Sequence, residues 1–133
     1  MTKKELRKSV YDKCDGKCAY CGEELPYEKM HVDHIKPVIR DMEYNREKRR
    51  YVSNGIMLKP ENHCFENMLP SCRACNNWKH SFDLETFRWD IEQQIIRLNK
   101  YSGGFRLAKR YGLVEEYGKA IVFYFETLPT LKF

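Results

Sequence analysis

The sequence predicts an α+β fold, and three patterns along its 133 residues lead to this prediction. Two short segments with strand-like character flank a long polar stretch, a helical repeat of apolar residues follows them, and a Cys-x-x-Cys pair lies on each side of the polar stretch. A chain of this length fits one compact domain with a modest core, whose stability a bound metal ion would increase. We therefore expect residues 1–133 to form a single domain.

The N-terminal segment predicts a short helix over residues 3–13. Thr2 and Glu5 have the spacing of a capping box, in which each side chain bonds the backbone amide of the other. Leu6 and Val10 follow one helical turn apart, as on the buried face of a helix. This helix leads directly into the first cysteine pair.

The middle of the chain predicts two strands with a long loop between them. Residues 30–34 alternate apolar and polar side chains, which is typical of a half-buried strand, and residues 67–71 form a short returning strand. Residues 40–66 are polar, with Asn54-Gly55 as a turn signal. We expect this stretch to be a loop with at most one short helix, and loops of this length are usually functional.

The C-terminal half predicts helices and one further strand. A short helix spans residues 73–80, and Asp83 caps the helix that follows. Gly103-Gly104 closes this second helix, residues 105–111 form a basic helix, and residues 120–125 form a buried strand. The second helix has a stripe of apolar residues that we expect to pack, namely Leu84, Phe87, Ile91, Ile95 and Leu98.

Charge and hydropathy limit the classes of function. The formal net charge is +5 and the pI is about 8.9, which suits a polyanionic partner without identifying one. Basic residues gather at 46–50 and 106–110, where a solvated surface is an equally good explanation. The longest apolar run, residues 120–125, is too short to span a bilayer, and the N-terminus has no apolar signal region. We expect an intracellular, reducing compartment and no membrane partner.

The two cysteine pairs predict one structural zinc ion bound by Cys18, Cys21, Cys72 and Cys75. Four thiolates at this spacing complete a closed tetrahedral shell. Closing the 50-residue loop between the pairs costs on the order of 3 to 4 kcal/mol plus a constant. Structural zinc contributes roughly 10 to 16 kcal/mol, so binding outweighs closure. Cys14 and Cys64 are expected to be small buried apolar residues, although either is able to replace a paired cysteine.

A second group of polar residues lies between and just after the cysteine pairs. Asp33 and His34 end the first predicted strand, while Asn76 and His80 lie one turn apart on the short helix. A carboxylate, an amide oxygen and an imidazole can converge on one cation, with phosphate and water taking the open positions. The sequence therefore predicts a site for a second metal ion.

These residues stand in two motifs, HVDHIKP and ENMLPSCRACNNWKH, that resemble the HNH endonucleases carrying Cys-x-x-Cys pairs. The resemblance covers roughly residues 10–90. It implies a treble-clef-like ββα-metal core at about 10–82, with a helical and strand extension at 83–133. It also implies that His34 is the general base, Asp33 binds the catalytic metal, and Asn67 braces the hairpin. The third motif residue is Asn76 or His80, and the choice between them stays open.

The resemblance implies hydrolysis of DNA phosphodiester bonds with Mg²⁺, Mn²⁺ or a similar divalent cation, one strand being nicked per site. Arg73 and Lys79 are candidate phosphate contacts. Proteins of this type occur in bacteriophages and their hosts, and some act beside the phage terminase. The sequence does not choose between a monomer and a dimer.

Two other functions remain open. A non-catalytic zinc module of treble-clef type that binds nucleic acid or protein needs the cysteines but not Asp33, His34 or Asn67. A hydrolase of another phosphate ester needs the same groups as the nuclease. His31 and His63 are left out of the site. Three aromatic residues are assigned to core packing, namely Trp78, Phe82 and Trp89.

Overall fold

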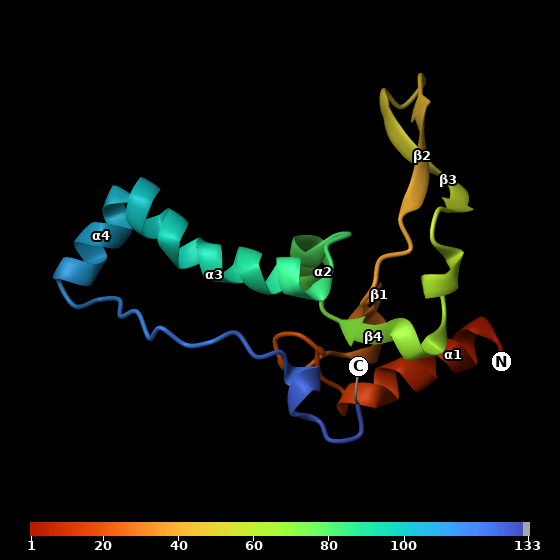
Figure 1. The fold of residues 1–133 in the computed structure, drawn as a ribbon, viewed down its shortest axis with the longest axis horizontal. Helices are drawn as coiled ribbons and strands as arrows, with labels where there is room; N and C mark the ends of the chain where they lie inside the picture. The colour runs from red at the N-terminus through yellow and green to blue at the C-terminus, as the bar shows by residue number, and fades with distance from the viewer. Residues whose placement is uncertain (132–133) are drawn as a thin grey trace.

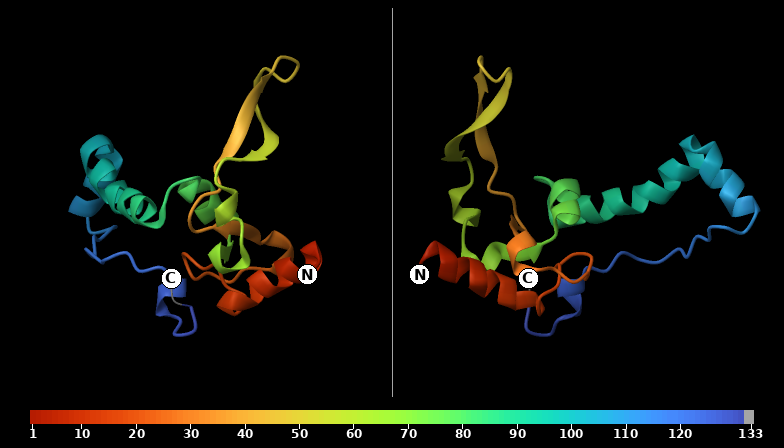
Figure 2. Two further views of the ribbon diagram at one scale, coloured as in Figure 1. Left: turned by 45° about the vertical axis from the view of Figure 1, so that its right-hand side comes forward. Right: turned by 180° about the vertical axis from the view of Figure 1, so that it is seen from behind.

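The computed structural model describes residues 1–131 and has an α+β architecture with a small central body and two projecting arms (Figure 1). The predicted extension at 83–133 thus includes two residues, 132 and 133, that lie outside the described part. The body contains α1 (Lys3–Tyr11), β1 (His31–His34), β4 (Met68–Ser71) and α2 (Arg73–Lys79). One arm is a β-hairpin, and the other is a long helix followed by a shorter one (Figure 2).

Helix α1 (Lys3–Tyr11) opens the body as the capping box predicts. The Thr2 hydroxyl accepts from the Glu5 amide at 3.1 Å, and the Glu5 carboxylate accepts from the Thr2 amide at 3.0 Å. A 3₁₀ turn at Asp12–Cys14 continues the helix until Asp15 adopts a left-handed conformation. The helix packs one face into a cluster of buried residues, namely Val10, Leu25, Met30 and Met68.

The central sheet confirms both strands predicted around the polar stretch. Strand β1 (His31–His34) pairs antiparallel with β4 (Met68–Ser71), and His34 lies opposite Met68. Val32 packs against the cluster beside α1, while Asp33 forms an ion pair with α2. Both faces of this small sheet are therefore covered.

The polar stretch forms a hairpin, so the prediction of a long loop with at most one short helix is wrong. Strand β2 (Arg40–Asn45) pairs antiparallel with β3 (Arg50–Met57). Asn54-Gly55 is not the turn but lies inside β3, where the register shifts at a bulge and Gly55 has φ +84°. The polar composition hid the strands because both faces of the hairpin meet solvent, which removes the alternation that reveals a half-buried strand.

Three α-helices begin at or after Arg73 in the described part of the chain. Helix α2 (Arg73–Lys79) matches the predicted helix and ends at His80, which has φ 51°. Asp83 caps α3 (Leu84–Tyr101) as predicted, its carboxylate accepting from the Thr86 amide at 2.8 Å. Ser102 ends α3 and caps α4 (Gly103–Arg110), so the two glycines begin a helix and do not close the previous one.

The apolar stripe of α3 packs only along its first half. Phe87 is buried and Ile91 is half-buried, whereas Ile95 and Leu98 are 43% and 39% exposed. The second half of α3 extends away from the body and contacts α4 instead of the core (Figure 1). The expectation of core packing is also wrong for three exposed aromatic residues, Trp78, Phe82 and Trp89.

The predicted strand at residues 120–125 does not form, because the segment pairs with no strand and ends in a 3₁₀ turn at Tyr124–Thr127. The Tyr124 and Phe125 amides donate to carbonyls of the first cysteine loop at 3.0 and 2.8 Å. Phe123 and Phe125 are buried in the main core, where Tyr20 packs edge-on against both rings. Aromatic packing rather than a β-ladder holds this segment in place. Within residues 1–131, no helix has the length and hydropathy that crossing a membrane requires.

Candidate functional site

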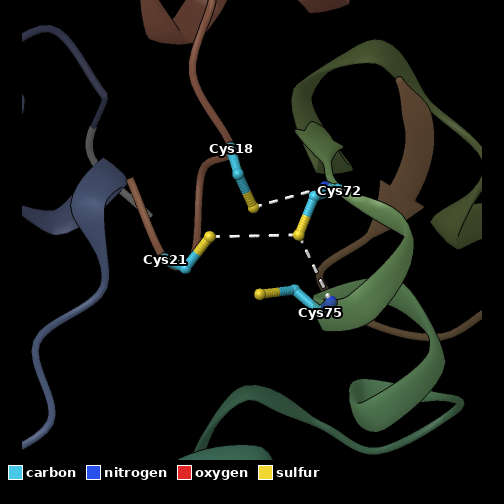
Figure 3. A group of neighbouring side chains, drawn as sticks. All are labelled: Cys18, Cys21, Cys72 and Cys75. Atoms are coloured by element: carbon cyan, nitrogen blue, oxygen red, sulfur yellow. Dashed lines mark hydrogen bonds between the residues drawn. The ribbon is translucent and has the colours of Figure 1, made fainter. Parts of the chain in front are cut away.

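Four cysteines converge between the first loop and the start of α2 (Figure 3). The sulfur atoms of Cys18, Cys21, Cys72 and Cys75 all lie within 4.8 Å of one another. The Sγ atoms of Cys21 and Cys72 are 3.9 Å apart. Four sulfurs around zinc, each at about 2.3 Å, are roughly 3.8 Å from one another. The spacing and the donor type therefore fit a structural zinc ion.

The local backbone prepares these sulfurs to carry negative charge. The Cys72 amide donates to Cys18 Sγ at 3.3 Å, and the Cys75 amide donates to Cys72 Sγ at 3.4 Å. The Cys75 thiol and several backbone amides lower the pKa of Cys18 to about 4. Burial raises the pKa of Cys21 to about 11, and the charge of the neighbouring Cys18 thiolate adds to the rise. A bound cation of charge two would supply the missing compensation.

The two remaining cysteines lie outside the cluster. Cys14 is fully buried, as expected, and burial raises its pKa to about 12. Cys64 is exposed, so the expectation that it is a buried apolar residue is wrong. The candidate metal ligands are therefore the four paired cysteines.

A groove of about 660 Å³ opens where β1, α2 and the base of the hairpin meet. Asp33 and His34 line it from the end of β1, and Asn76 and His80 line it from α2. The sequence predicted His34 as a base beside a cation held by Asp33 with Asn76 or His80, and all four residues line one groove. The other lining residues come mainly from the hairpin and its approach, namely Pro37, Val38, Ile39, Arg40 and Met42, with Asn77 and Ser81.

The Asp33 carboxylate is tied to a buried lysine. Its Oδ2 accepts from the Tyr20 hydroxyl and lies 3.1 Å from Lys79 Nζ, which also donates to the His34 carbonyl at 2.8 Å. Burial raises the pKa of Asp33, while the Lys79 ammonium opposes the rise. Lys79 is 0% exposed and bonds inward, so the expectation that it contacts a phosphate is wrong. It instead fixes the end of β1 to α2.

Replacing Lys79 by methionine is expected to destabilise the protein by about 3 to 5 kcal/mol, because the Asp33 charge is left buried without its partner. Chemical denaturation followed by circular dichroism measures the change in the free energy of unfolding. The exposed Lys59 provides a control, and Lys59→Met should change it by less than about 0.5 kcal/mol. Adding Asp33→Asn to Lys79→Met should recover part of the loss, and a Lys79→Met variant as stable as the control would contradict the structural role.

His34 is half-buried beside a second histidine that the sequence analysis left out. His34 Nε2 and His63 Nδ1 are 3.0 Å apart, so one ring donates to the other. Burial and the nearby charges of His63, Arg40 and Lys79 lower the pKa of His34 to about 4. The His34 imidazole is therefore neutral at pH 7 and able to accept a proton. His63 lies 29 residues after His34 and reaches it through the 3₁₀ turn at Pro60–Asn62, so no spacing rule in the sequence pointed to it.

Asn67 joins the segment after β1 to the turn that precedes β4. Its Oδ1 accepts from the Lys36 amide at 2.9 Å, and its Nδ2 donates to the carbonyls of Lys36 and Asn62 at 2.8 and 2.7 Å. The Asn67 carbonyl also accepts from the Ile35 amide at 3.0 Å. These four bonds fix the chain on both sides of the sheet end that carries His34.

Asn76 and His80 differ in how freely they can reach a ligand. Asn76 is half-buried inside α2, whereas His80 is exposed at the helix end. The His80 ring lies 3.1 Å from the Ser81 hydroxyl through Nδ1, which leaves Nε2 available. Both side chains line the groove, so the geometry keeps both as candidate metal ligands.

Comparison with known proteins adds little to this geometry. No protein-family model matches the sequence, and no curated protein matches it. Among solved structures, the chain is similar to the crystal structure of the Type II-C Cas9 enzyme from Actinomyces naeslundii. The TM-score is 0.45 and the identity is 17%, over 81% of this chain and 10% of that chain. A similarity at this level does not define a shared fold, so the function is inferred from the site itself.

Proposed function

We propose that this protein is a metal-dependent endonuclease of the HNH type that hydrolyses phosphodiester bonds in DNA. The observation that carries the proposal is the convergence of Asp33, His34, Asn76 and His80 on one groove. In this proposal β1, β4 and α2 form a ββα-metal core within about residues 10–82, and residues 83–133 extend the same domain. The four-cysteine cluster fixes the position of α2 relative to the sheet.

His34 is the general base of the proposed reaction. Its neutral ring faces the groove, where it can take a proton from the water that attacks the scissile phosphate. His63 positions the ring through Nε2, which leaves Nδ1 to accept the proton. Asn67 holds the backbone directly after His34, at Ile35 and Lys36, and so limits the movement of the base.

Asp33, with Asn76 or His80 or both, would hold a divalent cation such as Mg²⁺ or Mn²⁺ in the groove. Hard oxygen ligands suit these ions, and they occupy only part of the coordination sphere. When bound, such an ion would act as a Lewis acid that stabilises the negative charge on the leaving 3′ oxygen. Lys79 and Tyr20 both bond Oδ2 of Asp33 and so restrict the orientation of this carboxylate.

A cationic side chain in the groove lining suits a polyanionic substrate. Arg40 lines the groove beside His34, where a guanidinium can bind the scissile or a neighbouring phosphate. The groove contains a single candidate base, His34, so we expect the protein to cut one strand per encounter. A double-strand break then requires a dimer or a second visit.

The test is a plasmid assay with the purified, zinc-loaded protein. We expect supercoiled DNA to be converted to the nicked circle in the presence of Mg²⁺, Mn²⁺ or a similar ion, and not in EDTA. Linear product should follow the nicked form in time. DNA binding without cleavage under every metal condition would overturn the proposal in favour of a non-catalytic zinc module.

A further inference from the structure

The hairpin formed by β2 and β3 projects from the body and has no buried residue in either strand (Figure 2). Within the described residues, its sheet contains only these two strands. An isolated two-stranded hairpin is marginally stable in water, because it has no apolar face to bury. Contact with a binding partner would therefore stabilise the hairpin.

The two faces of the hairpin differ in charge. Tyr44 lies opposite Tyr51, and Met42 lies opposite Ser53, so these side chains share one face with Arg40. We call this set the tyrosine face. Arg40 and Met42 also line the groove beside His34, which makes the tyrosine face continuous with the proposed active site.

The acidic residues of the two strands lie on the opposite face. Asp41 and Glu43 alternate with the tyrosine face along β2. Asn54 holds both carboxylates there, since its Nδ2 donates to Asp41 at 2.7 Å and to Glu43 at 3.4 Å. The tyrosine face consequently contains no carboxylate that would repel a phosphate backbone.

The turn of the hairpin concentrates positive charge. Residues 46–50 contain four basic side chains and one acidic side chain, a net charge of +3. All four cations, Arg46, Lys48, Arg49 and Arg50, are exposed, and none forms an ion pair in the part of the chain that the structure describes. The Asn45 side chain accepts from the Lys48 amide at 3.0 Å and orders the turn.

We infer that the hairpin is a DNA-binding arm that lies along the duplex next to the cut site, with the tyrosine face toward the bases and the basic turn on phosphates. This inference rests on the proposed function. A two-stranded ribbon fits the major groove of B-DNA, which is about 12 Å wide. Tyr44 and Tyr51 are 55% and 67% exposed and offer hydroxyl and ring contacts to base edges.

The length of the arm sets the distance between its contacts and the cut. The six residues of β2 span about 20 Å, which corresponds to about six base pairs. The arm thus enlarges the footprint on one side of the scissile phosphate. The turn and the two tyrosines contact no reacting atom and act on binding alone.

The test compares two arm variants with the wild-type protein. The turn variant carries Arg46→Gln, Lys48→Gln, Arg49→Gln and Arg50→Gln, and the face variant carries Tyr44→Ser and Tyr51→Ser. A charge-matched control replaces four exposed lysines outside the arm by glutamine, at Lys3, Lys4, Lys100 and Lys119. Fluorescence anisotropy with a 30-base-pair duplex, in EDTA and across 50 to 200 mM salt, gives binding without cleavage.

The turn variant is expected to lose about ten-fold or more in affinity at 100 mM salt, and its salt slope should fall by about 3 to 4, because each lost phosphate contact removes roughly 0.9. The face variant should bind more weakly with an unchanged slope. Single-turnover nicking at saturating protein should proceed at the wild-type rate in both variants. Their zinc content and circular dichroism should match the wild type, because the arm buries no core residue.

The outcomes separate this inference from the proposed function. Arm-dependent binding by a protein that cuts no DNA would overturn the nuclease and leave the arm as a DNA-binding element. Wild-type cutting, with both arm variants binding DNA as tightly as the charge-matched control, would overturn the arm. A fall in the saturating nicking rate of either variant would also overturn it, since the arm would then act in the chemical step.

Discussion

Replacing Cys72 by serine is expected to release the zinc ion and to unfold the central body. Cys72 lies at the junction of β4 and α2, and its sulfur accepts from the Cys75 amide as the cap of α2. The same sulfur is 3.9 Å from Cys21 Sγ, so its loss opens the metal shell. Structural zinc contributes roughly 10 to 16 kcal/mol. That contribution is as large as the whole stability of a typical domain, about 5 to 15 kcal/mol.

The measurements are zinc content by atomic emission and thermal unfolding by circular dichroism. Wild-type protein should hold one zinc ion per chain and unfold cooperatively, whereas Cys72→Ser should hold none and show no transition. Cys64→Ser is the matched control, because Cys64 is exposed and outside the cluster. It should keep its zinc and lose less than about 0.5 kcal/mol. A Cys72→Ser variant with full zinc content would refute the assignment.

The elements around the metal cluster could be predicted because their signals are local in sequence. The capping box of Thr2 and Glu5 and the Asp83 cap each depend on residues three apart, and both helices begin where these signals stand. The first strand of the central sheet was recognised from its alternation of apolar and polar residues, and residues 67–71 were predicted as the strand that returns beside it. Four residues of the groove followed from motif spacing, since β1 and α2 are both short and regular.

The features that were missed depend on contacts between distant segments. The pairing of β2 with β3 is supported by no apolar face, so the sequence pattern resembled a loop. The Lys79 side chain was treated as exposed because its helix is polar, yet it is buried in an ion pair with Asp33. His63 reaches His34 only through the turn at Pro60–Asn62. The run at 120–125 has strand propensity, but aromatic packing against Tyr20 and Phe87 decided its conformation.

Replacing His34 by alanine is expected to lower the single-turnover nicking rate by about 10² to 10⁴, the usual contribution of a general base. His34 ends β1 on the rim of the groove and contributes no hydrophobic core contact, so zinc content and melting temperature should stay at wild-type values. His31→Ala is the control, because His31 is exposed on the same strand and lines no groove wall. It should nick plasmid at the wild-type rate.

Comparison of this variant with Cys72→Ser separates the two proposed metal sites. Loss of nicking with zinc retained places the chemistry in the groove, since four thiolates leave no coordination position for water or phosphate. His63→Ala should reduce the rate by less than His34→Ala, because it removes the group that orients the base but leaves the base in place. Wild-type nicking by His34→Ala would exclude this imidazole as the base.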